Sequence, residues 1–189
     1  MKRIFIAIRI NPGERLTGAV ESMKKELAGE HIRWVDMNQL HLTLAFLGDT
    51  EDVRINGITQ FLDEIAESTE EFSFRITGLG VFRNLKEPRV IWAGIGSDEK
   101  LDGLYNSIKA SIKELGIETE ERPFIPHLTV GRVKSLKNSS ILGKILDSYH
   151  DSHFQTVMVY EVILYESILG SSGPTYIPLH KSGMQSGCL

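Results

Sequence analysis

A regular alternation of apolar and polar positions opens the chain. Over residues 3–10 every second residue is isoleucine, which is the two-residue period of a strand with one buried face. The other face carries Arg3, Phe5, Ala7 and Arg9. Two guanidinium groups and an aromatic ring would suit a nucleotide, and Phe5 could stack on a terminal base. An ordinary solvated face with an incidental phenylalanine accounts for the pattern equally well.

Helical and strand periodicities alternate along the rest of the chain. Apolar residues at three- and four-residue spacing predict helices between Asn11 and Gly29 and over residues 52–68, 97–115 and 139–149. Further strands are expected at residues 32–35, 40–47, 71–79, 89–95, 127–131, 154–159, 160–169 and 175–179. Few of these strands are continuously apolar, as parallel strands are. The order strand–helix–strand–strand, occurring twice, therefore predicts an α+β fold with antiparallel sheets.

Two tetrapeptides share one pattern of histidine, apolar residue, threonine, apolar residue. They are His41-Leu42-Thr43-Leu44 and His127-Leu128-Thr129-Val130. A shuffled chain of this composition would hold only about 0.1 such tetrapeptides, so the repeat favours chemistry over chance. In a strand, each tetrapeptide would place its imidazole and hydroxyl on one face and its apolar residues on the other. Two such sheets facing each other would surround one cavity with groups able to cleave a phosphate ester without a metal.

Length and composition limit the other possibilities. The 189 residues suffice for one domain with a real interior, and the net charge of −4 comes without any basic tract. A protein that coats long nucleic acid is therefore not expected, whereas small or terminal substrates fit. The single cysteine, Cys188, allows no internal disulfide, and the sequence has no signal-peptide or membrane-span pattern. A cytoplasmic protein that does not act at a membrane is expected.

The other histidines favour less specific interpretations. His150 and His153 have a spacing that could bind zinc on a helix, but no accompanying Glu or Cys pattern supports a site. Neither a metal nor another cofactor is therefore expected. His31 and His180 are expected at the surface or in local hydrogen bonds. Phe46 shares the parity of Leu42 and Leu44, which favours packing in the core.

The chain resembles the bacterial and archaeal RNA 2′,3′-cyclic phosphodiesterases, also called 2′-5′ RNA ligases, of the two-histidine phosphoesterase superfamily. The resemblance includes both tetrapeptides and further segments, in the expected order along nearly the whole chain. These segments are 3–7, 33–35, 40–44, 46–48, 78–82, 88–92, 124–132, 165–167 and 173–176. The resemblance implies a bilobal α+β fold, with two pseudo-symmetric antiparallel sheets, outer helices and a central groove, as a single domain over residues 1–189.

The resemblance also implies an activity and the residues that carry it. The activity is hydrolysis of a 2′,3′-cyclic phosphate at an RNA 3′ end to a 2′-phosphomonoester, and reversible 2′-5′ RNA ligation is a further possible activity. The protein is expected to act as a monomer. His41 would protonate the departing O3′ and His127 would activate water, with Thr43 and Thr129 as hydroxyl donors. The residues alone do not say which histidine is the acid and which is the base. A 2′-5′ oligonucleotide or small cyclic nucleotide phosphodiesterase and a non-catalytic RNA-end binder are the alternatives.

Two residues bear on how the substrate phosphate would be held. Arg132 matches the family pattern for a phosphate contact, whereas strand parity turns it away from the His127 face unless a bulge at Gly131 redirects it. Many relatives carry a basic residue where this chain has Ala45, on the predicted face of His41. One contact to substrate phosphates would then be missing, which bears on the length of the substrate.

Overall fold

Two antiparallel sheets form the framework of the computed structural model, which describes residues 1–96, 98–118, 123–170 and 173–187. The four-stranded sheet has the order β3-β1-β8-β9 and consists of β1 (Lys2–Arg9), β3 (His41–Thr50), β8 (Glu161–Leu169) and β9 (Pro174–Gly183). The five-stranded sheet has the order β2-β6-β5-β4-β7 and consists of β2 (His31–Trp34), β4 (Phe72–Phe82), β5 (Val90–Ile95), β6 (His127–Ser135) and β7 (His153–Val159). The predicted α+β fold with antiparallel sheets is confirmed.

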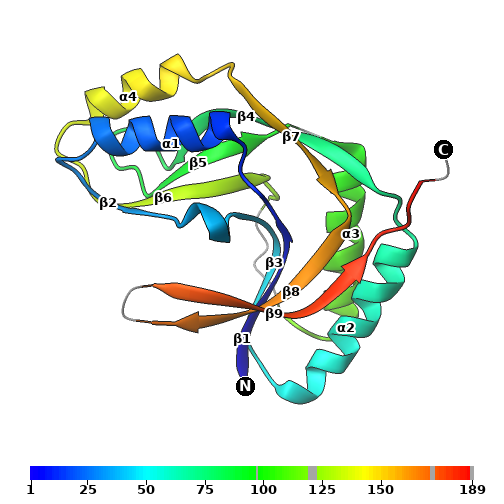
Figure 1. The fold of residues 1–189 in the computed structure, drawn as a ribbon. Helices are drawn as coiled ribbons and strands as arrows, with labels where there is room; N and C mark the ends of the chain where they lie inside the picture. The colour runs from blue at the N-terminus through cyan, green and yellow to red at the C-terminus, as the bar shows by residue number, and fades with distance from the viewer. Residues whose placement is uncertain (97, 119–122, 171–172, 188–189) are drawn as a thin grey trace.

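Two helices cover the outer face of each sheet (Figure 1). The helices α2 (Asp52–Glu67) and α3 (Glu99–Glu114) pack on the four-stranded sheet, and α1 (Glu14–Glu26) and α4 (Ser139–Ser148) pack on the five-stranded one. Their apolar stripes face the sheets, as the three- and four-residue spacing predicts. A single turn of 3₁₀ helix, η1 (Met37–Gln39), leads into β3.

Each sheet contains strands from both halves of the sequence. The C-terminal strands β8 and β9 complete the four-stranded sheet, while β2 and β4 from the first half belong to the five-stranded one. One cluster of buried residues, which includes Ile6, Ile58, Ile91 and Leu128, contains side chains from both sheets and their helices. The two tetrapeptides nevertheless lie in different sheets, His41 on β3 and His127 on β6, as predicted.

Several element boundaries differ from the sequence prediction. Helix α1 begins at Glu14 rather than next to Asn11, and its N-cap is Gly13. Strand β1 is buried on both faces over residues 4–8, because side chains of β8 and β9 pack against Phe5 and Ala7, so its prediction as a half-buried strand was wrong. Asp98 caps α3 by accepting hydrogen bonds from the backbone N–H groups of Lys100 and Leu101; Ser97 and Cys188 lie outside the described residues.

Candidate active site

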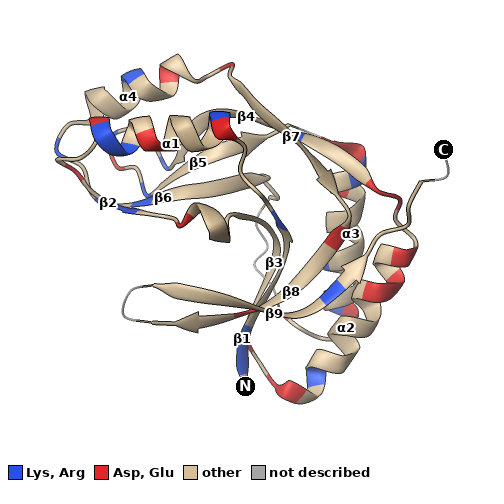
Figure 2. Ribbon diagram, viewed as in Figure 1, with Lys and Arg blue, Asp and Glu red and all other residues tan. Residues whose placement is uncertain are grey.

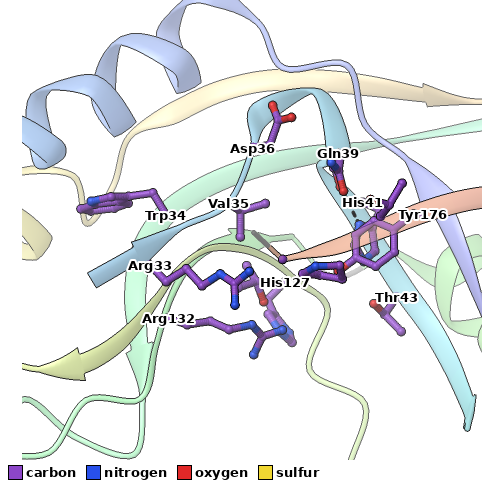
Figure 3. Close-up of a pocket in the computed structure, with 14 residues that line it drawn as sticks. Arg33, Trp34, Val35, Asp36, Gln39, His41, Thr43, His127, Arg132 and Tyr176 are labelled. Atoms are coloured by element: carbon purple, nitrogen blue, oxygen red, sulfur yellow. Dashed lines mark hydrogen bonds between the residues drawn. The ribbon is translucent and has the colours of Figure 1, made fainter. Parts of the chain in front are cut away.

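A cavity of about 370 Å³ lies where the two sheets meet, and both tetrapeptides contribute to it. The His and Thr side chains of β3 and β6 face the cavity, while Leu42 and Leu128 are buried behind them. Further lining residues come from β2, from the η1 turn and from β9, as Figure 3 shows. The complete lining is Arg33, Trp34, Val35, Asp36, Gln39, His41, Thr43, His127, Thr129, Arg132, Gly173, Pro174, Thr175 and Tyr176.

The two imidazoles are held in the same way. Nδ1 of His41 lies 2.7 Å from the carbonyl oxygen of Gln39, and Nδ1 of His127 lies 2.7 Å from that of Ile125. A carbonyl oxygen only accepts, so each Nδ1 carries the hydrogen and donates it. In the neutral imidazole the bare nitrogen is then Nε2, which remains free to take or give a proton. Each carbonyl belongs to the residue two positions before its histidine, so the support is built into both tetrapeptide strands.

Aromatic rings pack against both imidazoles. The ring of His41 lies 5.1 Å from that of Phe5 and 4.9 Å from that of Tyr176, between centroids. The ring of His127 lies 4.6 Å from that of Phe82, edge to face at 87°. Phe5 is only 3% exposed. Its predicted stacking on a substrate base is therefore wrong: the ring supports His41 from behind and has no face free for a base.

A one-residue bulge follows each tetrapeptide histidine at the same distance. In β3 the pairing with β1 omits Leu44, and in β6 the pairing with β5 omits Val130. Each bulge shifts the alternation of faces, so the residue five positions after each histidine does not follow simple parity. Arg132 consequently lines the cavity, and Phe46 is 46% exposed. The core position predicted for Phe46 is wrong for this reason.

Positive charge is concentrated beside the histidines. Arg33 and Arg132 are cross-strand partners on β2 and β6, and both line the cavity (Figure 3). The basic segments of these two strands are blue in Figure 2. Like charges opposite each other destabilise a sheet unless an anion or another partner compensates them. Neither Arg33 nor Tyr176 was predicted from the sequence to be a site residue. Both stand in segments of the family resemblance, but their contact with the cavity depends on strand pairing.

This environment favours the neutral imidazoles. Burial lowers the pKa of His41, and the nearby charges of Arg132 and His127 lower it further, against the opposing effect of the hydrogen bond to Gln39. Burial and Arg132 likewise lower the pKa of His127, against the hydrogen bond to Ile125. A bound phosphate would counter the cationic field and raise both pKa values. The site is therefore suited to taking up an anion before proton transfer begins.

A second cavity, of about 530 Å³, adjoins the first. Thr43 and His127 line both cavities, so the two adjoin at the tetrapeptides. Its other walls are mostly apolar and aromatic: Leu44, Ala45, Phe46, Phe82, Tyr105, Lys109, Ile112, Pro123, Phe124 and Ile125. Ala45 thus lies on the wall of this cavity, together with Phe46, which is 46% exposed and has the guanidinium carbon of Arg3 4.9 Å from the centroid of its ring.

His150 and His153 lie away from both cavities and are not on a helix. His150 follows α4 in a turn and pairs with Asp151, and His153 begins β7. Among the described residues, no group of three or more His, Cys, Asp or Glu side chains is placed to hold a metal ion. His180 bonds to Asp63 at 2.7 Å. Within the residues that the structure describes, no helix is long and apolar enough to cross a membrane.

Comparisons with known proteins identify the family to which the chain belongs. The chain is similar to proteins named RNA 2′,3′-cyclic phosphodiesterase. The one from Thermotoga maritima is 30% identical over 99% of this chain and 98% of its own length. The one from Archaeoglobus fulgidus is 34% identical over 92% of this chain and 96% of its own length. The crystal structure of LigT from E. coli in complex with 3′-AMP has a TM-score of 0.77 and 25% identity, covering 98% of this chain and 99% of that one. The profile described as LigT like phosphoesterase matches residues 8–92 and again residues 95–176. The chain therefore belongs to the LigT-like phosphoesterase family.

Proposed function

We propose that this protein hydrolyses the 2′,3′-cyclic phosphate at RNA 3′ ends to a 2′-phosphomonoester. The observation that carries the proposal is the pair of imidazoles at one cavity, each with Nδ1 on a backbone carbonyl and Nε2 free to react. The relatives named RNA 2′,3′-cyclic phosphodiesterase support the substrate class. The 3′-AMP bound to E. coli LigT, a ribonucleotide with phosphate on the ribose, supports it as well.

The reaction needs one base and one acid on opposite sides of phosphorus. Nε2 of His127 takes a proton from water as the water oxygen attacks phosphorus, and the bond from phosphorus to O3′ breaks. Nε2 of protonated His41 gives its proton to O3′, which leaves as the 3′-hydroxyl. The phosphate stays on O2′, and the two histidines return to their starting states by proton exchange with solvent. Each proton transfer contributes on the order of 10²–10⁴ in rate.

The negative charge that builds on the phosphoryl oxygens needs preorganised donors. The Thr43 and Thr129 hydroxyls line the cavity beside the histidines, and the Arg132 guanidinium lies close enough to lower the pKa of both. Donors of this kind, fixed before the reaction, stabilise developing charge without reorganisation. These groups supply the charge stabilisation that a metal supplies in other phosphoesterases, so we assign no metal to the reaction.

The second cavity accommodates the base of the terminal nucleotide. It begins at Thr43 and His127, where the phosphate lies, and the partly exposed ring of Phe46 lines it. Stacking of a base on an aromatic ring contributes roughly 1–3 kcal/mol and tolerates any base. Phe46 therefore takes the role that the sequence suggested for Phe5, and base identity at the 3′ end should matter little.

One chain supplies the complete set of groups. His41, Thr43, His127, Thr129 and Arg132 all come from the same copy, although they belong to two sheets. The shared buried cluster joins these sheets, which supports a single domain over residues 1–189 that acts as a monomer. The cavity needs no residue from a second copy.

A single assay tests the proposal. EDTA-treated protein is incubated with an oligonucleotide ending in a 2′,3′-cyclic phosphate in ¹⁸O-labelled water, and the product is mapped. We expect a 2′-phosphate that carries the label on phosphorus and an unlabelled 3′-hydroxyl. A 3′-phosphate product would reverse the assigned orientation of the ribose, and activity lost in EDTA but restored by zinc would refute the metal-free mechanism. A 5′-hydroxyl oligonucleotide added to the same mixture reports any 2′-5′ ligation.

A further inference from the structure

The second cavity has a wall that the proposed reaction does not use. Helix α3 and the segment before β6 form this wall, with Tyr105, Lys109 and Phe124 facing the cavity. Thr43 and His127 line both cavities, so a molecule whose phosphorus lies at the histidines is next to the cavity that this wall bounds. The wall is therefore part of the surface that a chain attached to the reacting nucleotide would meet.

Two stacked rings and one cation make up this wall. The rings of Tyr105 and Phe124 are almost parallel, at 6°, with centroids 4.0 Å apart. Nζ of Lys109 lies 5.9 Å from the centroid of the Tyr105 ring. Tyr105 and Lys109 are four positions apart on α3, so they lie on the same face of the helix. The packing of Tyr105 against Phe124 connects α3 to the segment that leads into His127.

An aromatic surface with a cation over one of its rings has the chemistry to receive a nucleoside joined to a phosphodiester. Single-stranded nucleic acid is commonly bound by aromatic rings under the bases and basic side chains along the backbone. Phe46 already provides a surface for the terminal base, on the β3 side of the same cavity. The nucleotide on its 5′ side is one phosphodiester away, and the wall formed by Tyr105, Lys109 and Phe124 has the chemistry to receive it.

We propose that Lys109 binds the phosphodiester between the last two nucleotides of the RNA and that the penultimate nucleoside lies against the Tyr105–Phe124 pair. This inference rests on the proposed function and adds a second nucleotide subsite to it. The enzyme then prefers an oligonucleotide to a mononucleoside 2′,3′-cyclic phosphate. A charged hydrogen bond to phosphate and one stacked base together correspond to a preference of about 100-fold or more in kcat/KM.

The test compares two substrates with the intact protein. The substrates are a dinucleotide ending in a 2′,3′-cyclic phosphate and the corresponding mononucleoside 2′,3′-cyclic phosphate, and the measured quantity is the ratio of their kcat/KM values. We expect Lys109→Ala to lower this ratio about tenfold, Lys109→Arg to lower it less, and Tyr105→Leu to lower it several-fold. Lys113→Ala is the matched control, because Lys113 is exposed on the next turn of α3 and does not line the cavity.

Each outcome decides one of the two proposals. If the unmodified protein hydrolyses neither substrate, the proposed function fails. If it hydrolyses both without preferring the dinucleotide, or if Lys109→Ala leaves the ratio unchanged, the second subsite is refuted while the proposed function stands. Higher salt should lower the ratio in the unmodified protein more than in Lys109→Ala, because only the former has this phosphate contact. Thermal melting of each variant identifies any loss of fold.

Discussion

The role of Arg132 gives the sharpest test of the electrostatics of this site. We consider Arg132→Met, which removes the guanidinium and keeps an unbranched apolar side chain. Arg132 lies on the cavity wall and lowers the pKa of both His41 and His127. Two effects should follow from one substitution: loss of stabilisation of the phosphoryl charge, and a rise in both imidazole pKa values.

The size of the kinetic effect follows from the chemistry of the lost group. Removing one preorganised donor to a developing oxyanion costs on the order of 10²–10³ in kcat. Lysine keeps the charge but lacks the planar pair of donors, so Arg132→Lys should recover only part of this loss. We expect kcat/KM to fall by about 10²–10³ in Arg132→Met, with thermal stability close to that of the unmodified protein because the side chain is exposed at the cavity.

The pH dependence gives an independent reading of the same substitution. Activity requires one neutral and one protonated imidazole, so kcat/KM should be bell-shaped in pH, with limbs that belong to the coupled pair. Because Arg132 holds both pKa values down, its removal should move both limbs to higher pH. NMR titration of His41 and His127 in the free protein should show the same upward shift. Unchanged imidazole titrations, or near-normal activity of a folded Arg132→Met protein, would refute the role assigned to Arg132.

Other substitutions test the remaining parts of the site. His41→Ala and His127→Ala should each lose at least ~10² in kcat, and the double variant should lose little more, because the two groups act as a unit; near-normal turnover of either folded single variant would contradict the mechanism. Phe5→Leu should lower kcat with little change in KM and destabilise the fold by about 1–2 kcal/mol, since the buried ring supports an imidazole; a raised KM alone would indicate base stacking on this ring instead. Gly173→Ala should reduce activity and lower the melting temperature, because φ is +142° at Gly173 and a Cβ there would meet the Arg33 guanidinium on the cavity wall; a crystal structure with the Arg33 side chain unmoved, or an unchanged melting temperature, would contradict this.

Much of the architecture could be predicted from the sequence because hydrophobic periodicity is a local property. The spacing of apolar residues predicted the helices and most strands, and the repeated tetrapeptides identified His41, Thr43, His127 and Thr129 among the side chains that line the cavity. In each tetrapeptide strand the alternation of faces buries the apolar residue that follows the histidine and directs the His and Thr side chains to the other side. These features depend only on neighbouring residues and on the geometry of a strand.

Sheet membership and the bulges were decided by the tertiary structure. Simple parity, applied to Phe46 and Arg132, turned both away from the histidine faces, yet Phe46 is partly exposed and Arg132 lines the catalytic cavity. An extra residue in each strand, Leu44 and Val130, shifts the alternation there. A bulge depends on the register with the neighbouring strand, and that strand is distant in the sequence.

The burial of the first strand also could not be predicted from the sequence alone. An alternating pattern predicts one buried face, but Phe5 and Ala7 on the other face of β1 are also buried, because side chains of the C-terminal strands β8 and β9 pack against them. Phe5 is buried there against His41 and Tyr176. The sequence by itself determined which groups can do chemistry, since residue type and strand period are local. Only the tertiary structure decided which rings support the imidazoles and which are open to substrate, because that depends on strands brought together from opposite ends of the chain.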